Sequence, residues 1–109
     1  MAQLLTRGAL ALLVLGAAFG AHAQQQDPRA QRGFIFVKTN CASCHSIDKV
    51  RPSPLKVAPP FRTLHRRYPV DSLAEALAEG IVTGHPMMPE FQLDPGQVGD
   101  VIAYLKTLQ

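Results

Sequence analysis

The five residues Cys41-Ala42-Ser43-Cys44-His45 constrain the fold of this chain more than any other feature. They place two thiols and an imidazole at the C-x-x-C-H spacing that attaches a haem covalently, with each thiol adding to one vinyl group and the histidine reaching the iron. A dithiol redox site or half of a zinc site would use the same cysteines, but the sequence shows neither a βαβ pattern nor a second ligand pair. The motif therefore predicts a fold built around one covalently bound haem c.

The N-terminus has the pattern of a secretory signal. One basic residue, Arg7, precedes an apolar run over residues 8–20, and Ala21-His22-Ala23 offers an A-x-A cleavage site. A retained membrane anchor would need about 20 apolar residues, and this run is shorter. We therefore expect residues 1–23 to be a cleaved signal peptide and residues 24–109 to form one domain. The mature protein is expected to be soluble in a bacterial periplasm, without stable insertion in the membrane.

Three helices are predicted in the mature chain, joined by irregular segments and without any strand pattern. The first begins at Pro28 and runs to about Lys38. The second has Asp71 as its N-cap and stops at Gly80. The third has Asp94 as its N-cap, followed by the residues of a capping box. Its apolar stripe consists of Val98, Val101, Ile102, Leu105 and Leu108. A core of this size is marginal alone, so a bound haem would complete it.

Residues 51–60 contain four prolines, which exclude a regular helix or a central strand. Two interpretations remain open from the residues alone. The segment is either an ordinary surface loop, or a loop that covers the haem on its histidine side and gives a backbone carbonyl to the imidazole of His45.

An iron held by His45 needs a sixth ligand or keeps an open position, and this choice separates an electron carrier from a haem enzyme. The candidates are Met87 and Met88, with His85 and His65 as rivals. Prolines at positions 86 and 89 stiffen the segment around both methionines, so that a non-helical loop can hold a sulfur in place. A thioether would also close the iron to substrates. The residues therefore favour a methionine, and His65, in a basic segment, is expected at the surface.

From residue 24 onward the chain resembles the small class I bacterial cytochromes c. The residues that carry the resemblance are Gly33 and Phe34 before the haem motif, then Ala58-Pro59-Pro60-Phe61, then Met88-Pro89-Glu90-Phe91 and a last helix containing Tyr104. The family implies an all-α fold of about three to four helices packed around one covalently bound haem. It also implies that the first and last helices cross at Gly33, Phe34 and Tyr104.

The same resemblance assigns roles in the site. It implies that Met88 is the second axial ligand opposite His45, with Met87 as a neighbour that lines the pocket. It implies that the carbonyl of Pro59 accepts a hydrogen bond from His45. The family has glycine where this chain has Ala58, and this departure together with the second proline leaves the carbonyl of Pro60 as the alternative.

Charge is separated along the chain. Acidic residues predominate from position 71 to 100, whereas the segment between the haem motif and the second helix is basic, with Lys49, Arg51, Lys56, Arg62, Arg66 and Arg67. Such a dipole can orient the protein as it approaches an acidic patch on a redox partner such as a dehydrogenase, reductase or oxidase. One or more of the arginines can instead pair with haem propionates. Export and the lack of an aromatic stacking platform argue against nucleic acid as a partner.

The sequence thus predicts a monomeric, periplasmic single-electron carrier with one haem, whose iron cycles between Fe(II) and Fe(III). Two alternatives stay open: a dedicated haem acceptor subunit of a periplasmic dehydrogenase, and a haem enzyme or gas sensor with an open iron. No nucleophile, carboxylate pair or other catalytic constellation is evident in the sequence. We therefore do not expect an enzyme.

Overall fold

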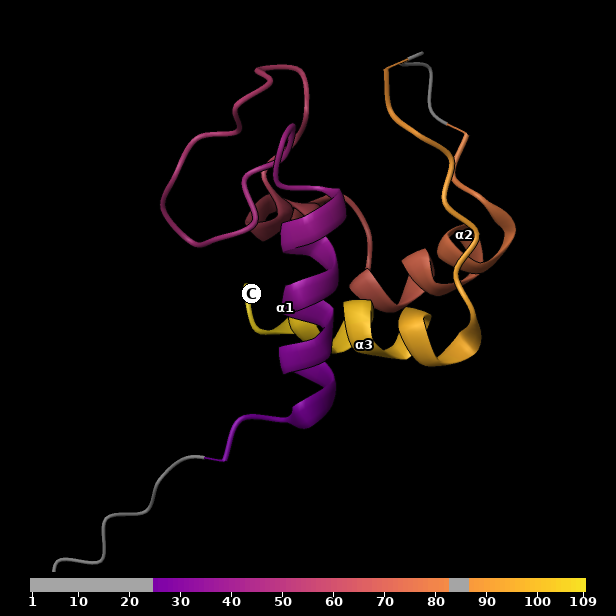
Figure 1. Ribbon diagram of the computed structural model, residues 1–109. Coiled ribbons are helices and arrows are strands. Elements are labelled where there is room, and N and C mark those ends of the chain that lie inside the picture. Colours follow the sequence, from indigo (N-terminus) through magenta and orange to yellow (C-terminus); the bar gives the residue numbers. More distant parts are fainter. Residues whose placement is uncertain (1–24, 83–86) are drawn as a thin grey trace, which may run out of the picture.

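The computed structural model describes residues 25–82 and 87–109, and within them every regular element is helical. The elements in chain order are α1 (Pro28–Asn40), the 3-10 helices η1 (Phe61–Arg66) and η2 (Val70–Ser72), α2 (Leu73–Glu79) and α3 (Pro95–Lys106) (Figure 1). The predicted all-α class is confirmed. In the described part of the chain, no helix has the length and apolar character needed to cross a membrane.

Helix α1 begins where the sequence predicts it and leads directly into the haem motif. The side chain of Asp27 caps it by accepting the backbone N–H of Arg29, and Pro28 occupies the first turn. The helix ends at Asn40, two residues beyond the predicted end, and Cys41 is its C-cap. The motif is therefore attached to a rigid element rather than to a free loop.

Helix α3 also forms as predicted, because its signals are local. The carboxylate of Asp94 accepts the backbone N–H of Gln97 at 2.8 Å, and the side chain of Gln97 accepts the backbone N–H of Asp94 at 3.2 Å. These two bonds are the predicted capping box. All five residues of the predicted apolar stripe are buried.

The predicted start of the second helix is wrong by one position. Asp71 lies inside η2, and Ser72 is the N-cap of α2. The cause is tertiary: Val70 is buried in the core, and a 3-10 turn around it brings the chain to the helix. Asp71 forms instead an ion pair of 2.8 Å with Lys106 at the end of α3. The predicted end is correct, since Gly80 follows α2 with φ of 105°, a conformation that favours glycine.

Helices α1 and α3 cross at the centre of the molecule (Figure 1). Gly33 makes the close approach possible: a Cβ at this position would lie 2.0 Å from the carbonyl oxygen of Asp100. Beside it the rings of Phe34 and Tyr104 pack with centroids 5.5 Å apart. The core continues from this crossing through Val37, Val70, Leu93, Val98, Val101, Ile102, Leu105 and Leu108. Segments 41–60 and 87–93 both extend to the same side of the crossing in Figure 1.

Candidate haem-binding site

The two cysteines lie in a tight turn that follows α1. The backbone N–H groups of Cys44 and His45 both donate to the carbonyl of Cys41, at 3.2 and 2.9 Å. No disulfide joins the two thiols, and both are half-buried. Burial, together with the nearby Cys44, raises the pKa of the Cys41 thiol to about 11. Dithiol redox sites work with a lowered thiol pKa, so this environment is the opposite of what such a site requires.

The imidazole of His45 is held at one nitrogen by the proline-rich loop. Its Nδ1 lies 2.8 Å from the carbonyl oxygen of Pro59. A carbonyl only accepts hydrogen bonds, so Nδ1 carries the proton, and Nε2 of the neutral ring keeps its lone pair for a metal. The alternative carbonyl, that of Pro60, accepts instead from the backbone N–H and the hydroxyl of Thr63, at 3.0 and 2.7 Å. The ring of Phe61 packs on the imidazole with centroids 4.8 Å apart.

The two methionines differ in exposure. Met87 is 73% exposed, whereas Met88 is half-buried. Their loop is closed at its base where the backbone N–H of Leu93 donates to the carbonyl of Leu77 at 2.9 Å. His85, the imidazole rival for the iron, lies outside the described residues. His65, the other histidine considered as a ligand, is exposed on η1.

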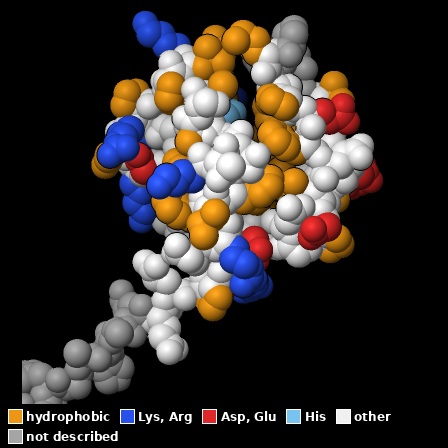
Figure 2. Space-filling model, in the orientation of Figure 1, with side chains coloured by type: hydrophobic (Ala, Val, Ile, Leu, Met, Phe, Trp, Pro, Cys, Tyr) orange, Lys and Arg blue, Asp and Glu red, His pale blue; other side chains and the backbone are white. Residues whose placement is uncertain are grey.

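Figure 2 shows a hollow in the face on view, with hydrophobic side chains gathered on both sides of it and a histidine side chain inside. The chain offers the groups that a haem needs: two thiols three positions apart, an imidazole held at Nδ1 only by the Pro59 carbonyl, a half-buried thioether at Met88 and partly buried apolar side chains. The aromatic rings of Phe61 and Phe91 and the aliphatic side chains of Leu73 and Leu77 are only partly buried against the core. The residues present therefore fit a covalently attached haem.

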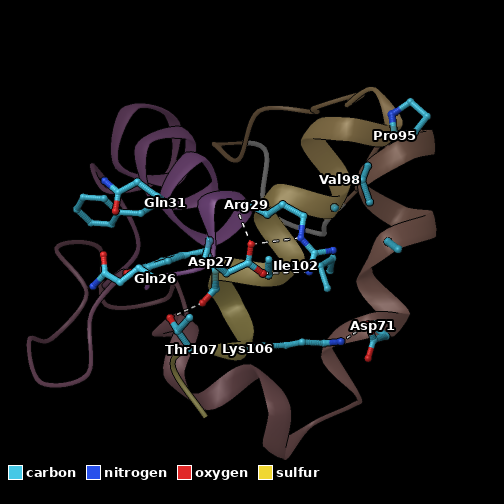
Figure 3. A pocket seen from close by; sticks show the side chains of 16 residues that line it. Gln26, Asp27, Arg29, Gln31, Asp71, Pro95, Val98, Ile102, Lys106 and Thr107 are labelled. Carbon is cyan, nitrogen blue, oxygen red and sulfur yellow. Dashed lines mark hydrogen bonds and ion pairs between the residues drawn. The ribbon is translucent and has the colours of Figure 1, made fainter. Parts of the chain in front are cut away.

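A groove of about 960 Å³ lies elsewhere, between the start of α1 and helix α3 (Figure 3). Phe34 and Ile102 are among the residues that line it, as are Lys106 and Asp71, which form an ion pair (Figure 3). No cysteine, histidine or methionine lines it. This groove cannot supply the iron ligands that the haem motif requires, so we place the site at the motif.

Comparison with known proteins agrees with this geometry. The family model described as Cytochrome c matches residues 30–109. The chain belongs to the cytochrome c family. The protein named cytochrome c-552 from Bradyrhizobium diazoefficiens is 34% identical to it over 80 residues, which are 73% of this chain and 75% of that protein. No solved structure gives a significant match.

Membership in the cytochrome c family identifies the cofactor as haem c, with iron and covalent attachment, as predicted. The protein is a c-type cytochrome of the electron-carrier kind, and its partners are redox proteins.

Proposed function

We propose that this cytochrome c is a periplasmic, monomeric carrier of single electrons, not an enzyme. Cys41 and Cys44 attach the haem, and His45 and Met88 bind the iron from opposite sides. The bound iron supplies a one-electron Fe(II)/Fe(III) couple. The observation that carries the proposal is the contact of 2.8 Å between Nδ1 of His45 and the Pro59 carbonyl, because it orients the ring and leaves Nε2 for the iron.

The contrast between the two methionines supports Met88 as the second ligand. A side chain that binds iron inside the fold must turn away from water, and Met88 is half-buried while its neighbour Met87 is largely exposed. A thioether ligand raises the reduction potential and leaves no position for a substrate. These properties suit a carrier.

The proposed location depends on the N-terminal segment. Residues 1–23 have the composition of a cleaved signal peptide and lie outside the described residues. The match to the family model begins at residue 30, after this segment, which supports a cytochrome c domain over residues 24–109. Sequencing the N-terminus of the protein from a periplasmic extract tests both points: a start near Gln24 is expected, and a retained leader in a membrane fraction would contradict the proposal.

Carbon monoxide binding tests the closed iron. The ferrous holoprotein is expected to bind little carbon monoxide, because both axial positions are filled. Rapid and complete binding by the unmodified protein would show an open iron and would favour the haem enzyme or gas sensor instead.

We propose that the basic segment guides the cytochrome to an acidic surface of its redox partner. Four of its basic side chains are exposed and form no ion pair among the described residues: Lys49, Lys56, Arg66 and Arg67. Arg51 is paired with Asp48 at 3.6 Å. Electron transfer to an acidic partner should therefore slow as ionic strength rises, since salt screens exposed charges. A rate independent of ionic strength would exclude this steering.

A further inference from the structure

Ser46 connects three parts of the loop that follows the haem motif. It comes directly after His45, and at 3% exposure it is the one buried polar residue among those that the structure describes. Its backbone N–H donates to Oγ of Ser53 at 3.0 Å, and its carbonyl accepts the backbone N–H of Phe61 at 2.9 Å. Its Oγ accepts a hydrogen bond of 3.1 Å from Nη1 of Arg62. The backbone N–H, the carbonyl and the hydroxyl oxygen of Ser46 therefore each have a hydrogen-bond partner.

The side chain of Arg62 holds residues 46–51 against the start of η1. The same Nη1 also donates to the carbonyls of Asp48 at 3.3 Å and Arg51 at 2.7 Å. The side chain is half-buried, and its three acceptors lie 11 to 16 positions earlier in the chain. A charged donor strengthens such bonds, and removing it would leave carbonyls and a buried hydroxyl without a partner. The Arg62 guanidinium is therefore used in hydrogen bonds within residues 46–62 and does not belong to the exposed basic surface.

The groups that orient His45 lie immediately beside Arg62 in the chain. They are the carbonyl of Pro59, bonded to Nδ1, and the ring of Phe61, packed on the imidazole. Residues 59–62 are aligned with residues 45–48 by the bond between Phe61 and Ser46 and by the contacts of Arg62. A shift between these two segments would move both the carbonyl and the ring relative to the imidazole.

We infer that Arg62 is a positioning residue: by holding residues 46–51 against residues 59–62, it fixes the orientation of the His45 imidazole on the haem iron. This inference rests on the proposed role of His45 as an axial ligand. It separates Arg62 from Lys49, Lys56, Arg66 and Arg67, whose exposed charges we propose to act in partner binding. Orientation of the imidazole affects the electron distribution of the ferric haem and its reduction potential.

The test uses three variants of the holoprotein. Arg62→Met keeps the aliphatic stem but removes the donors, and Arg66→Met on the same 3-10 helix removes an exposed charge as the matched control. Arg62→Lys restores a cationic nitrogen with three donors, which suits acceptors that all contact one atom of Arg62. The readouts are the haem methyl proton shifts of the ferric form, the reduction potential and amide hydrogen exchange at Phe61.

Arg62→Met is expected to change the spread of the haem methyl shifts, which reports the orientation of the axial imidazole plane. It should also shift the potential beyond the shift in Arg66→Met and speed exchange of the Phe61 amide roughly 10- to 100-fold. Arg62→Lys should recover part of each change. Indistinguishable shifts and potentials in Arg62→Met and Arg66→Met would overturn the inference.

A second variant keeps the inference testable if Arg62→Met yields no holoprotein. Ser46→Ala removes one acceptor of Arg62 and should alter the haem methyl shifts in the same direction to a smaller extent; unchanged shifts would count against the positioning role. Carbon monoxide binding distinguishes a failure of the proposed carrier function from a failure of the role of Arg62 alone. If the unmodified ferrous protein binds it fully, the proposed carrier function fails; if only the variant comparison is negative, the role of Arg62 alone fails.

Discussion

Replacing Gly33 with alanine should force the two central helices apart. The added Cβ would lie 2.0 Å from the carbonyl oxygen of Asp100 and 2.8 Å from Cβ of Tyr104. The Asp100 carbonyl oxygen is a backbone atom and the Tyr104 Cβ is fixed by the backbone, so no change of rotamer can remove these clashes. Helix α3 must therefore move away from α1 by about 1 Å or more. Overpacking of this kind costs up to about 3 kcal/mol, and the better helix propensity of alanine returns about 1 kcal/mol. We expect a net loss of about 2 kcal/mol.

Gly99→Ala is the matched control. Gly99 lies inside α3, and a Cβ there would meet no atom within 4 Å. The same substitution should therefore stabilise the protein by about 0.5–1 kcal/mol through helix propensity and a less flexible unfolded chain. Guanidinium unfolding of the two holoproteins, followed by far-UV circular dichroism, measures both changes from the midpoints at equal slope. If Gly33→Ala were as stable as the unmodified protein, or both variants moved in the same direction, the described helix crossing would be wrong.

Three further changes test other contacts. Asp94→Ala should lower the free energy of unfolding by about 1 kcal/mol in a urea titration, because it removes the side-chain hydrogen bond that caps α3. Ser72→Ala is the control and should have little effect, because the N-cap of α2 makes no such bond. The Arg32 guanidinium, which donates to Asp100 at 2.8 Å, lowers the pKa of that carboxyl. The stabilisation by this pair is therefore complete above the ordinary aspartate pKa of about 4 and is lost as pH falls through the lowered value. The stability difference between Arg32→Gln and the unmodified protein should shrink in acid, and a constant difference would contradict the pairing. Tyr104→Phe should destabilise the protein by about 1 kcal/mol, because the carbonyl of Ile47 loses the hydrogen bond that the Tyr104 hydroxyl donates. Thermal unfolding measures this change, and an unchanged midpoint temperature would show that water replaces the bond.

The sequence predicted elements whose signals are close together in the chain. The capping box at Asp94 and the apolar stripe after it are local, and α3 forms as expected. The predicted start of α2 was wrong because Asp and Ser are both favoured at N-cap positions, so the sequence does not distinguish Asp71 from Ser72. Burial of Val70 decides between them, and that is a property of the folded core.

The haem motif could be predicted because the chemistry fixes the spacing of its residues. The role of Arg62 could not, since its acceptors are a hydroxyl and two carbonyls far from it in the chain, and any residue type supplies a carbonyl. Composition alone groups it with the exposed basic residues. The contrast in exposure between Met87 and Met88 likewise depends on how the loop packs, because the two side chains are identical.

The optical spectrum of the ferric holoprotein in Met88→Ala and Met87→Ala tests the central claim most directly. Ligation of iron by a thioether gives a weak charge-transfer band at long wavelength that an open or bis-imidazole iron lacks. We predict that Met88→Ala abolishes this band and that Met87→Ala, which alters the largely exposed neighbour, retains it. Retention of the band in Met88→Ala with its loss in Met87→Ala would assign the ligand to Met87, and absence of the band from the unmodified protein would contradict methionine ligation altogether.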